Sequence, residues 1–470
     1  MEVKTKLGLV GLGVMGSNLA LNLEEHGCCV TVYNKESDWT DRFMQKEGKN
    51  KEFSAVYSLV DLAASLPRPR KIILMITAGR PVDQVIDSLL PYLEKGDMIF
   101  DCGNSFFQDT TRRMEALSQK GIEYMGIGVS GGAEGARRGP SIMPGGSQIA
   151  YKATESVWKA ISAKSTENAP CCAYMGSGGA GHFVKMVHNG IEYTDMQLIS
   201  EGYQLMRDLL GLSNDEAAEI FERFNCGRLS SYLYEITYKI LRFKDTDGEN
   251  LIEKIIDTAG AKGTGCQTAQ TALEEGVCLP VVTNSVFTRS LSIQRKLRKD
   301  AAEIFPHPTM KPAVQREEFL SKLENALYAA KLIAYAQGFS LLKQADSHYG
   351  WNLNPSSISA VWRGGCIIRS AFLNDISAAY QKNPALSDLL FDPYFASALR
   401  SCEASLREIC ILGIQASVSL PCLSSALSYF DLLRTEHMAT NLISAQRDFF
   451  GAHTYQKIGE DAPVHTNWQI

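Results

Sequence analysis

The chain has 470 residues, which is more than one hydrophobic core usually supports, so two or three domains are expected. Hydrophobic residues make up 45% of it and charged residues 21%, the proportions of an ordinary water-soluble protein. The net charge of −5 argues against a general nucleic-acid binder. No run of 18 apolar residues occurs, so no membrane association is expected.

Residues 1–7 carry three charges and run directly into a strand-like stretch, so we expect no secretory signal there. The twelve cysteines are scattered and form no Cys-x-x-Cys pair. The eight histidines are dispersed as well, so no metal site is expected. These features predict a cytoplasmic protein with reduced thiols.

The first part of the chain alternates strand-like runs with helical stretches. Such alternation predicts β-α-β units and a parallel sheet. A first helix is expected at residues 17–26, and strands are expected at residues 6–10, 29–33, 71–76, 97–101 and 122–126.

A glycine-rich turn joins the first strand to the first helix. Its glycines allow backbone N–H groups to approach a pyrophosphate at the start of the helix. A glycine turn in another kind of α/β protein is the alternative, but the strand before and the helix after favour a dinucleotide. We therefore predict a Rossmann-type cofactor-binding domain over residues 1–177, with cofactor contacts from Gly11, Leu12, Gly13, Val14, Met15 and Gly16.

The second predicted strand ends just before Asn34, Lys35 and Glu36. NAD enzymes usually place an acid near this point to hold the ribose 2′-hydroxyl. Asn34 carries no charge, and Lys35 can pair with a 2′-phosphate. We therefore predict that Asn34 and Lys35 contact the cofactor and that NADP is favoured over NAD. Glu36 is an unfavourable neighbour for a phosphate, and an exposed Lys/Glu pair without a role is the alternative.

After residue 177 strand signals almost vanish, and long amphipathic stretches predict an all-helical domain over residues 178–438. Residues 439–470 look like a tail, a short helix followed by polar sequence that needs another surface. The clearest helical stretches are residues 181–210, 216–225, 316–344 and 401–415.

Four polar residues follow a glycine-rich turn at 176–181, namely Lys185, His188, Asn189 and Glu192. Their spacing of i, i+3, i+4 and i+7 puts them on one face of a helix. Such a stripe is usually the solvent side of a helix. His and Asn between Lys and Glu, directly after a glycine turn, favour an active site instead.

These residue types fit a defined chemistry. A lysine that is neutral near pH 7 can take the proton of a secondary alcohol while hydride leaves for a nicotinamide. A β-keto acid formed in this way loses CO₂ through an enol, whose carbon a carboxylic acid can protonate without any metal. We predict Lys185 as the base and Glu192 as the acid.

Further segments contain candidate substrate binders. A serine followed by two glycines gives a substrate access to backbone donors, and a Lys and a Thr among glycines can hold a phosphate. A plain basic loop is the alternative for the second segment. The candidates are Ser130, Gly131, Gly132, Lys262, Thr264 and Arg289, with Arg447 and His453 in the tail.

Taken in order, five motifs resemble the decarboxylating 6-phosphogluconate dehydrogenase family over essentially the whole chain. They are the glycine turn at 11–16, Val129-Ser130-Gly131-Gly132, residues 185–193 from Lys185 to Tyr193, Trp362-Arg363-Gly364-Gly365-Cys366-Ile367-Ile368-Arg369, and Gln446-Arg447-Asp448 with Gly451-Ala452-His453.

The resemblance implies oxidation of 6-phosphogluconate by NADP to ribulose 5-phosphate, CO₂ and NADPH, in the pentose phosphate pathway. It implies a homodimer in which the tail reaches into the partner subunit, so that the active sites are shared. Lys185 and Glu192 keep their roles. The resemblance assigns the substrate's carboxylate and hydroxyls to Asn104 (also beside the cofactor), Ser130, His188 and Asn189, its phosphate to Tyr193, Lys262, Thr264 and Arg289, and contacts from the other subunit to Arg447 and His453.

The chain departs from the family pattern at Lys35-Glu36, Cys102, Ala133 and Cys266-Gln267. Two alternatives compete with the family interpretation. A short β-hydroxyacid dehydrogenase usually lacks the long helical extension and the tail. A non-catalytic dinucleotide-binding protein should have lost Lys185, Glu192 or the phosphate cluster, and all of these are present.

Overall fold

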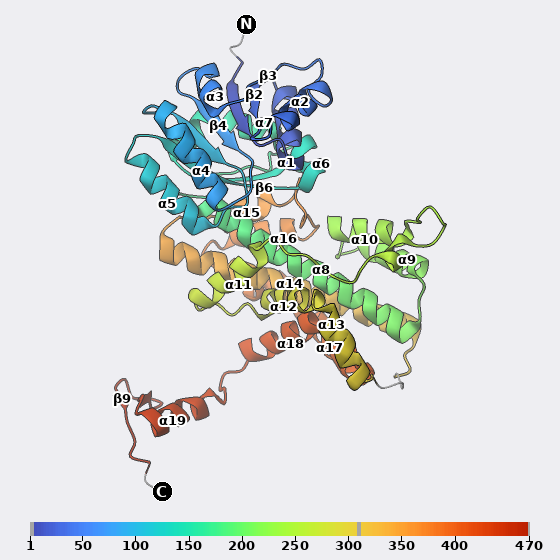
Figure 1. The fold of residues 1–470 in the computed structure, drawn as a ribbon. Helices are drawn as coiled ribbons and strands as arrows, with labels where there is room; N and C mark the ends of the chain where they lie inside the picture. The colour runs from blue at the N-terminus through green and yellow to red at the C-terminus, as the bar shows by residue number, and fades with distance from the viewer. Residues whose placement is uncertain (1–3, 308–311, 469–470) are drawn as a thin grey trace.

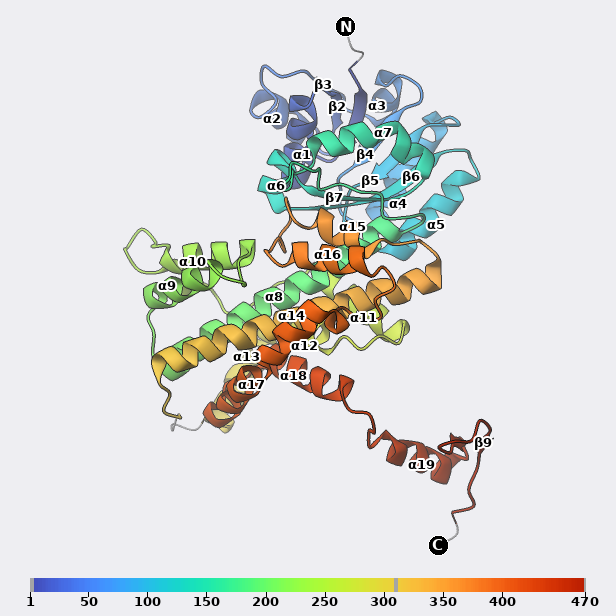
Figure 2. The same ribbon diagram turned by 180° about the vertical axis from the view of Figure 1, so that it is seen from behind.

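The computed structural model describes residues 4–307 and 312–468. The beginning of the 1–7 segment and the last two residues of the predicted tail therefore lie outside the described residues. A sheet domain occupies one end of the molecule, and a body of long helices follows it (Figure 1). Seen from behind, the C-terminal segment again runs out of the helical body (Figure 2).

The described part of the N-terminal region forms a seven-stranded sheet in the order β3-β2-β1-β4-β5-β6-β7. In such sheets, ligands bind at the carboxyl ends of the strands where the order reverses, which here lies between β1 and β4. The strands are β1 (Lys6–Val10), β2 (Cys29–Tyr33), β3 (Phe53–Ala55), β4 (Lys71–Leu74), β5 (Met98–Asp101), β6 (Glu123–Ser130) and β7 (Ser141–Gly146).

The prediction of a parallel sheet is confirmed for β1 to β6, but β7 pairs antiparallel with β6. The β7 sequence Ser-Ile-Met-Pro-Gly-Gly contains one β-branched residue, and Pro144 with two glycines hides its strand character. β3 has only three residues and gives too short a pattern to recognise. β6 runs four residues beyond its predicted end because Gly126 and Gly128 interrupt the apolar pattern.

Helices cover both faces of the sheet, as a Rossmann-type domain requires. One core layer contains Leu19 and Trp158, and the other contains Leu62 and Ile86, all buried. The elements between the strands are α1 (Val14–Glu25), α2 (Ser37–Gln45), α3 (Leu59–Ser65), α4 (Arg80–Leu89), the 3-10 turn η1 (Leu90–Tyr92), α5 (Phe107–Ser118), α6 (Gly132–Arg138) and α7 (Gln148–Ile161).

The helical region begins with α8 (Ala180–Leu210), which lies against α14 (Arg316–Tyr349) in the centre of the body (Figure 1). Within the described residues, no helix is both long and apolar enough to span a membrane. The remaining elements are α9 (Asn214–Asn225), α10 (Tyr232–Arg242), η2 (Leu251–Lys254), α11 (Thr264–Glu274), α12 (Pro280–Ser292), α13 (Arg295–Ile304), α15 (Pro355–Val361), α16 (Leu373–Lys382), η3 (Leu389–Phe391), α17 (Pro393–Ala416), α18 (Pro421–Leu433) and α19 (Thr440–Gly451).

Glycines let the first turn of α8 contact the sheet backbone directly. A Cβ at Gly128 of β6 would lie 2.4 Å from the Cβ of Lys185. A Cβ at Gly181 would lie 2.3 Å from the carbonyl oxygen of Gly126 and 2.4 Å from that of Met143. Since real Cβ atoms do not approach this closely, only glycines permit the contact, and it fixes where Lys185 stands.

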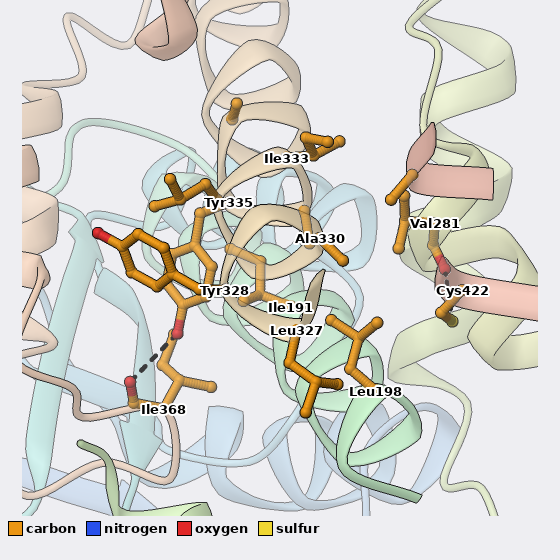
Figure 3. Packing of buried hydrophobic residues seen from close by; sticks show 14 of the residues in the cluster. Ile191, Leu198, Val281, Leu327, Tyr328, Ala330, Ile333, Tyr335, Ile368 and Cys422 are labelled. Atoms are coloured by element: carbon orange, nitrogen blue, oxygen red, sulfur yellow. Dashed lines mark hydrogen bonds between the residues drawn. The ribbon is translucent and has the colours of Figure 1, made fainter. Parts of the chain in front are cut away.

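The contact between α8 and α14 combines apolar packing with a buried ion pair. Ile191 lies among buried residues of α14 in Figure 3, where the Tyr335 hydroxyl donates a hydrogen bond to the carbonyl oxygen of Ile368. Beside this layer, Lys331 Nζ lies 2.6 Å from Asp195 Oδ2, and both side chains are almost fully buried. Tyr335 Oη lies 3.2 Å from the same carboxylate oxygen.

The C-terminal tail is folded upon itself around Asp448. This carboxylate accepts hydrogen bonds from the backbone N–H groups of Thr454 and Thr466 and from the Trp468 indole, and His465 Nδ1 lies 2.9 Å from it. Burial opposes the charged form, but these partners outweigh it and hold the pKa of Asp448 below its ordinary value. The expected irregular sequence after α19 thus includes a small hairpin, β8 (Tyr455–Gln456) and β9 (Pro463–Val464).

Replacing Lys331 by Met should destabilise the helical region by about 3–5 kcal/mol, because the charge of Asp195 would remain buried without its partner. The measurement is urea denaturation followed by tryptophan fluorescence. Lys239→Ala, which removes one of the two cationic partners of Glu235 near the surface, is the matched control. It should cost far less stability, because water and salt screen a pair at the surface. Equal costs for the two variants would contradict the prediction.

Candidate active site

The structure brings together the four polar residues predicted on α8. Lys185 Nζ donates to Asn189 Oδ1 at 2.7 Å and lies 3.4 Å from His188 Nδ1. The same ring nitrogen lies 3.7 Å from Glu192 Oε2. Lys185, His188 and Asn189 are buried, so this stripe is not the solvent side of the helix.

The end of β6 forms a second wall of this cluster. Ser130 Oγ lies 3.1 Å from His188 Nε2 and so links the sheet to the helix. Gly131 has a φ of +119°, and a Cβ there would lie 2.4 Å from the carbonyl oxygen of Gly365. The segment from Trp362 to Arg369 therefore passes directly over the Ser-Gly-Gly turn, and the Trp362 ring meets the His188 ring edge-on at 5.7 Å.

Burial moves the proton affinities of Lys185 and Glu192 in opposite directions. It lowers the pKa of the Lys185 ammonium, although the charge of Glu192 partly opposes this. It raises the pKa of the Glu192 carboxyl, although the charges of Lys185 and Arg289 oppose the rise. Burial and then the charge of Lys185 hold the pKa of His188 well below its usual value. A lysine that loses its proton readily and a carboxyl that keeps its own fit the roles of base and acid.

A positively charged region, the cationic end of the site, lies just beyond Glu192 along α8. The guanidinium carbon of Arg289, on α12, lies 3.5 Å from the centre of the Tyr193 ring, and its Nη1 donates to the carbonyl oxygen of Gly260. Thr264 is the first residue of α11, and a Cβ at Gly265 would touch the Tyr193 ring at 2.6 Å. Tyr193, Thr264 and Arg289 therefore surround one place, and Lys262 is exposed on the loop just before it.

The glycine turn after β1 has the predicted shape. Gly11 has a φ of +102°, and a Cβ there would lie 2.4 Å from the carbonyl oxygen of Met75. A Cβ at Gly13 would meet nothing within 4 Å, so the turn is open above the start of α1. Asn34, predicted to contact the cofactor, also has a structural use. Its Oδ1 accepts from the Leu12 N–H at 2.8 Å, and its Nδ2 donates to Glu36 Oε2 at 3.0 Å.

Asn104 is exposed at the carboxyl end of β5, between the glycine turn and the Ser-Gly-Gly turn. Asp101 shapes this loop, because its carboxylate accepts from the Gly103 N–H at 3.1 Å and from Ser105 Oγ at 2.6 Å. Asn104 thus lies where the predicted cofactor and substrate regions meet, in keeping with its assignment to both.

Arg447 and His453 are not brought to this cluster within the chain. Both are exposed in the tail, which projects away from the helical body in both views (Figures 1 and 2). Among the departures from the family pattern, Ala133 and Cys266 are exposed on their helices, so they do not interrupt the packing of α8.

Sequence reasoning missed two groups on α8. His182, one turn before Lys185, lies 3.1 Å from the carbonyl oxygen of Asp101 through Nε2 and 2.7 Å from Thr110 Oγ1 through Nδ1. Asp195, one turn after Glu192, belongs to the buried ion pair with Lys331. Both continue the polar stripe at a spacing of three, so extending the i±3 pattern in both directions finds them.

Cys366 appears in the sequence only as part of the motif at residues 362–369, and no sequence pattern indicates its place in the site. Its Sγ donates to the carbonyl oxygen of Trp362 at 3.0 Å, and burial raises its pKa to about 12, against the effect of the charge of Lys185. It is therefore an apolar, protonated wall of the site.

Comparisons with known proteins agree with this geometry. Residues 6–176 match the NAD binding domain of 6-phosphogluconate dehydrogenase, and residues 181–468 match the C-terminal domain of 6-phosphogluconate dehydrogenase. The decarboxylating 6-phosphogluconate dehydrogenase of Cunninghamella elegans is 48% identical over 470 residues, covering 100% of this chain and 97% of the relative. That of Rattus norvegicus is 48% identical over 464 residues, covering 98% and 96%.

A solved structure resembles the whole chain. The 6-phosphogluconate dehydrogenase of Plasmodium falciparum, described in its apo form, with its cofactor NADP+ and with its substrate 6-phosphogluconate, is 41% identical. It superposes with a TM-score of 0.95 and covers 98% of this chain and 100% of its own. Two matched domains and full-length similarity at this level leave one conclusion: the chain belongs to the 6-phosphogluconate dehydrogenase family.

Proposed function

We propose that this protein oxidises and decarboxylates 6-phosphogluconate to ribulose 5-phosphate and CO₂ while NADP is reduced to NADPH, as a step of the pentose phosphate pathway. One observation carries the proposal. Lys185 and Glu192 share a buried helix face, and their pKa values are shifted in the directions that a base and an acid require. The cationic end with Arg289 lies beside them, where a phosphate would be held.

The glycine turn fits a dinucleotide because Gly13 leaves open space at the N-terminus of α1. The chain's own groups there would be the backbone of residues 11–16, with Asn104 beside them. Lys35 is exposed after β2 and would pair with the 2′-phosphate, while Glu36 is held by Asn34. When bound, NADP supplies the acceptor for the hydride.

The substrate would lie along α8 from the Ser130 end to the Arg289 end. Ser130, His188 and Asn189, together with Asn104, would bind its carboxylate and hydroxyls. The guanidinium of Arg289 and the hydroxyls of Tyr193 and Thr264 would bind its phosphate, with Lys262 reaching in from the loop. A charged phosphate held at one end fixes which hydroxyl stands at Lys185.

Protons would then move between the substrate and two side chains. Neutral Lys185 takes the proton of the hydroxyl that is oxidised. Its ammonium stays beside the new carbonyl oxygen and stabilises the negative charge that develops there as CO₂ leaves. Glu192 gives its proton to the carbon that carried the carboxylate, and the enol becomes a ketone.

We further propose a cytoplasmic homodimer in which Arg447 and His453 of one subunit complete the site of the other. In the tail, Leu442, Ile443, Phe449 and Phe450 are more than half exposed, an apolar surface that a second subunit would cover. The exposed, unpaired Cys226, Cys266 and Cys278 fit a reducing compartment.

The unmutated protein should release one CO₂ for each NADPH formed from 6-phosphogluconate. Lys185→Met should lower turnover more than about 10³-fold, because the base is lost. Both are followed by NADPH absorbance and CO₂ capture, and NADP binding is followed by fluorescence titration. Lys152→Met, at an exposed position on α7, is the control. No reduction by the unmutated protein, or near-normal turnover by Lys185→Met, would refute the assignment.

Lys35→Ala should raise KM for NADP roughly 10- to 100-fold, the value of a charge-assisted contact with the 2′-phosphate. KM for NAD, which lacks that phosphate, should hardly change. Steady-state kinetics with each cofactor measures both, and Lys49→Ala on the same domain controls for a general loss of positive charge. An equal rise for both cofactors would show that Lys35 does not read the 2′-phosphate.

Mixing two inactive variants tests the shared site. Lys185→Met and Arg447→Ala homodimers each have two defective sites, but a hybrid dimer has one site with both residues intact. After unfolding and refolding together, the mixture should recover roughly a quarter of the parental activity, since half the dimers are hybrids with one working site. If the mixture stays as inactive as its components, Arg447 serves its own chain or has no role in the site.

A further inference from the structure

Three titratable side chains lie on the active face of α8, and His188 stands between Lys185 and Glu192. His188 Nδ1 lies 3.4 Å from Lys185 Nζ and 3.7 Å from Glu192 Oε2. Among the ion pairs of the described residues, none joins Lys185 directly to Glu192. His188 Nδ1 therefore lies between the base and the acid, 3.3 Å from Asn189 Oδ1, and a shift of a few tenths of an ångström would bring Glu192 within hydrogen-bond distance.

A count of protons gives this order a meaning, and the count rests on the proposed function. Lys185 gains the proton of the oxidised hydroxyl, and Glu192 gives one to carbon. Any proton that Lys185 lends to the enol oxygen returns to it when the ketone forms. Each turnover thus leaves Lys185 with one proton more and Glu192 with one fewer. The reaction itself releases none, because the carboxylate leaves as neutral CO₂ while the cationic nicotinamide ring becomes neutral.

We propose that His188 returns this proton from Lys185 to Glu192 between turnovers. Neutral His188 accepts at Nδ1 as one N–H bond of the Lys185 ammonium breaks. The imidazolium then gives the proton from the same Nδ1 to the Glu192 carboxylate, where an O–H bond forms. Lys185 ends neutral and Glu192 ends protonated, which is the state that the next turnover needs.

The surroundings of His188 suit a relay. Ser130 Oγ lies 3.1 Å from Nε2 and Trp362 lies edge-on to the ring, so this end of the imidazole is held and a small turn about it would carry Nδ1 from Lys185 toward Glu192. The ring is fully buried, so bulk water does not reach it. Burial lowers the pKa of Lys185 and raises that of Glu192, which brings donor and acceptor closer together. The lowered pKa of His188 means that the imidazolium is short-lived.

The test separates the first turnover from the following ones in a stopped-flow experiment. In His188→Asn, where an amide replaces the group near Nδ1, the first equivalent of NADPH per site should form more slowly, because a proposed substrate contact is lost. The steady-state rate should fall about tenfold further than the first-turnover rate, because each later turnover also waits for the slow return of a proton. Added imidazole, for which the smaller asparagine leaves space in place of the ring, should restore part of the steady-state rate and leave the first turnover unchanged.

His188→Gln is a second variant, with its amide nearer the Nε2 side, and should give the same separation. His348→Asn, at an exposed histidine on α14, controls for effects of imidazole elsewhere. A misfolded fraction lowers the amplitude of the first turnover and the steady-state rate in the same proportion. The ratio of the two therefore reports the relay even if a variant folds poorly.

The ¹⁵N NMR spectrum of histidine-labelled protein tests the relay in the absence of cofactor and substrate. The Nδ1 signal of His188 should follow the titration of Glu192, and Glu192→Gln should abolish that response. A parallel fall of first-turnover and steady-state rates, a change in KM alone, or a signal insensitive to Glu192 would overturn the relay. An unmutated protein that reduces no NADP would instead overturn the proposed function.

Discussion

The contact between the first turn of α8 and strands β6 and β7 is the constraint on which the site depends. At Gly128 and Gly181 no Cβ separates the helix from the sheet, so the two backbones meet directly. His182 then ties the same turn to the end of β5. A helix held this closely cannot slide or rotate without collision, and Lys185 therefore keeps a fixed position relative to the cofactor domain.

Along the rest of α8, buried charged groups are each matched by a partner. Asp195 has Lys331, and the Glu201 carboxylate accepts the free backbone N–H groups of Cys422 and Leu423 at the start of α18. Burial raises the pKa of Glu201 to about 7, although these donors oppose the rise. One helix thus positions the reacting groups at one end and anchors α14 and α18 further along. This anchoring adds to the precision of the site, because several contacts along α8 hold the helix together with the contact at its first turn.

Much of the fold follows from sequence patterns, and the exceptions have physical reasons. The alternation of strands and helices predicted β1, β2, β4 and β5, since each is a compact apolar run. β7 was not predicted from the sequence, because Pro144 and its glycines have low strand propensity and instead allow close contact with neighbouring segments. In the site, the i, i+3, i+4, i+7 spacing identified the active face of α8 from local geometry alone. The position of Cys366 and the pairing of Asp195 with Lys331 could not be predicted, because both depend on how segments far apart in the chain pack together.

The tail carries a consequence for assembly. Asp448 gathers its partners from within the tail itself, so this segment has its shape before any second subunit arrives. A pre-shaped segment gives up little conformational entropy on docking, and more of its contact energy remains to hold a complex together. In the proposed dimer, a subunit lost by dilution would take with it one part of its neighbour's site. Catalytic capacity would then follow protein concentration more steeply than in proportion, and the dissociation constant of the dimer would set the lowest level at which a cell could use the enzyme.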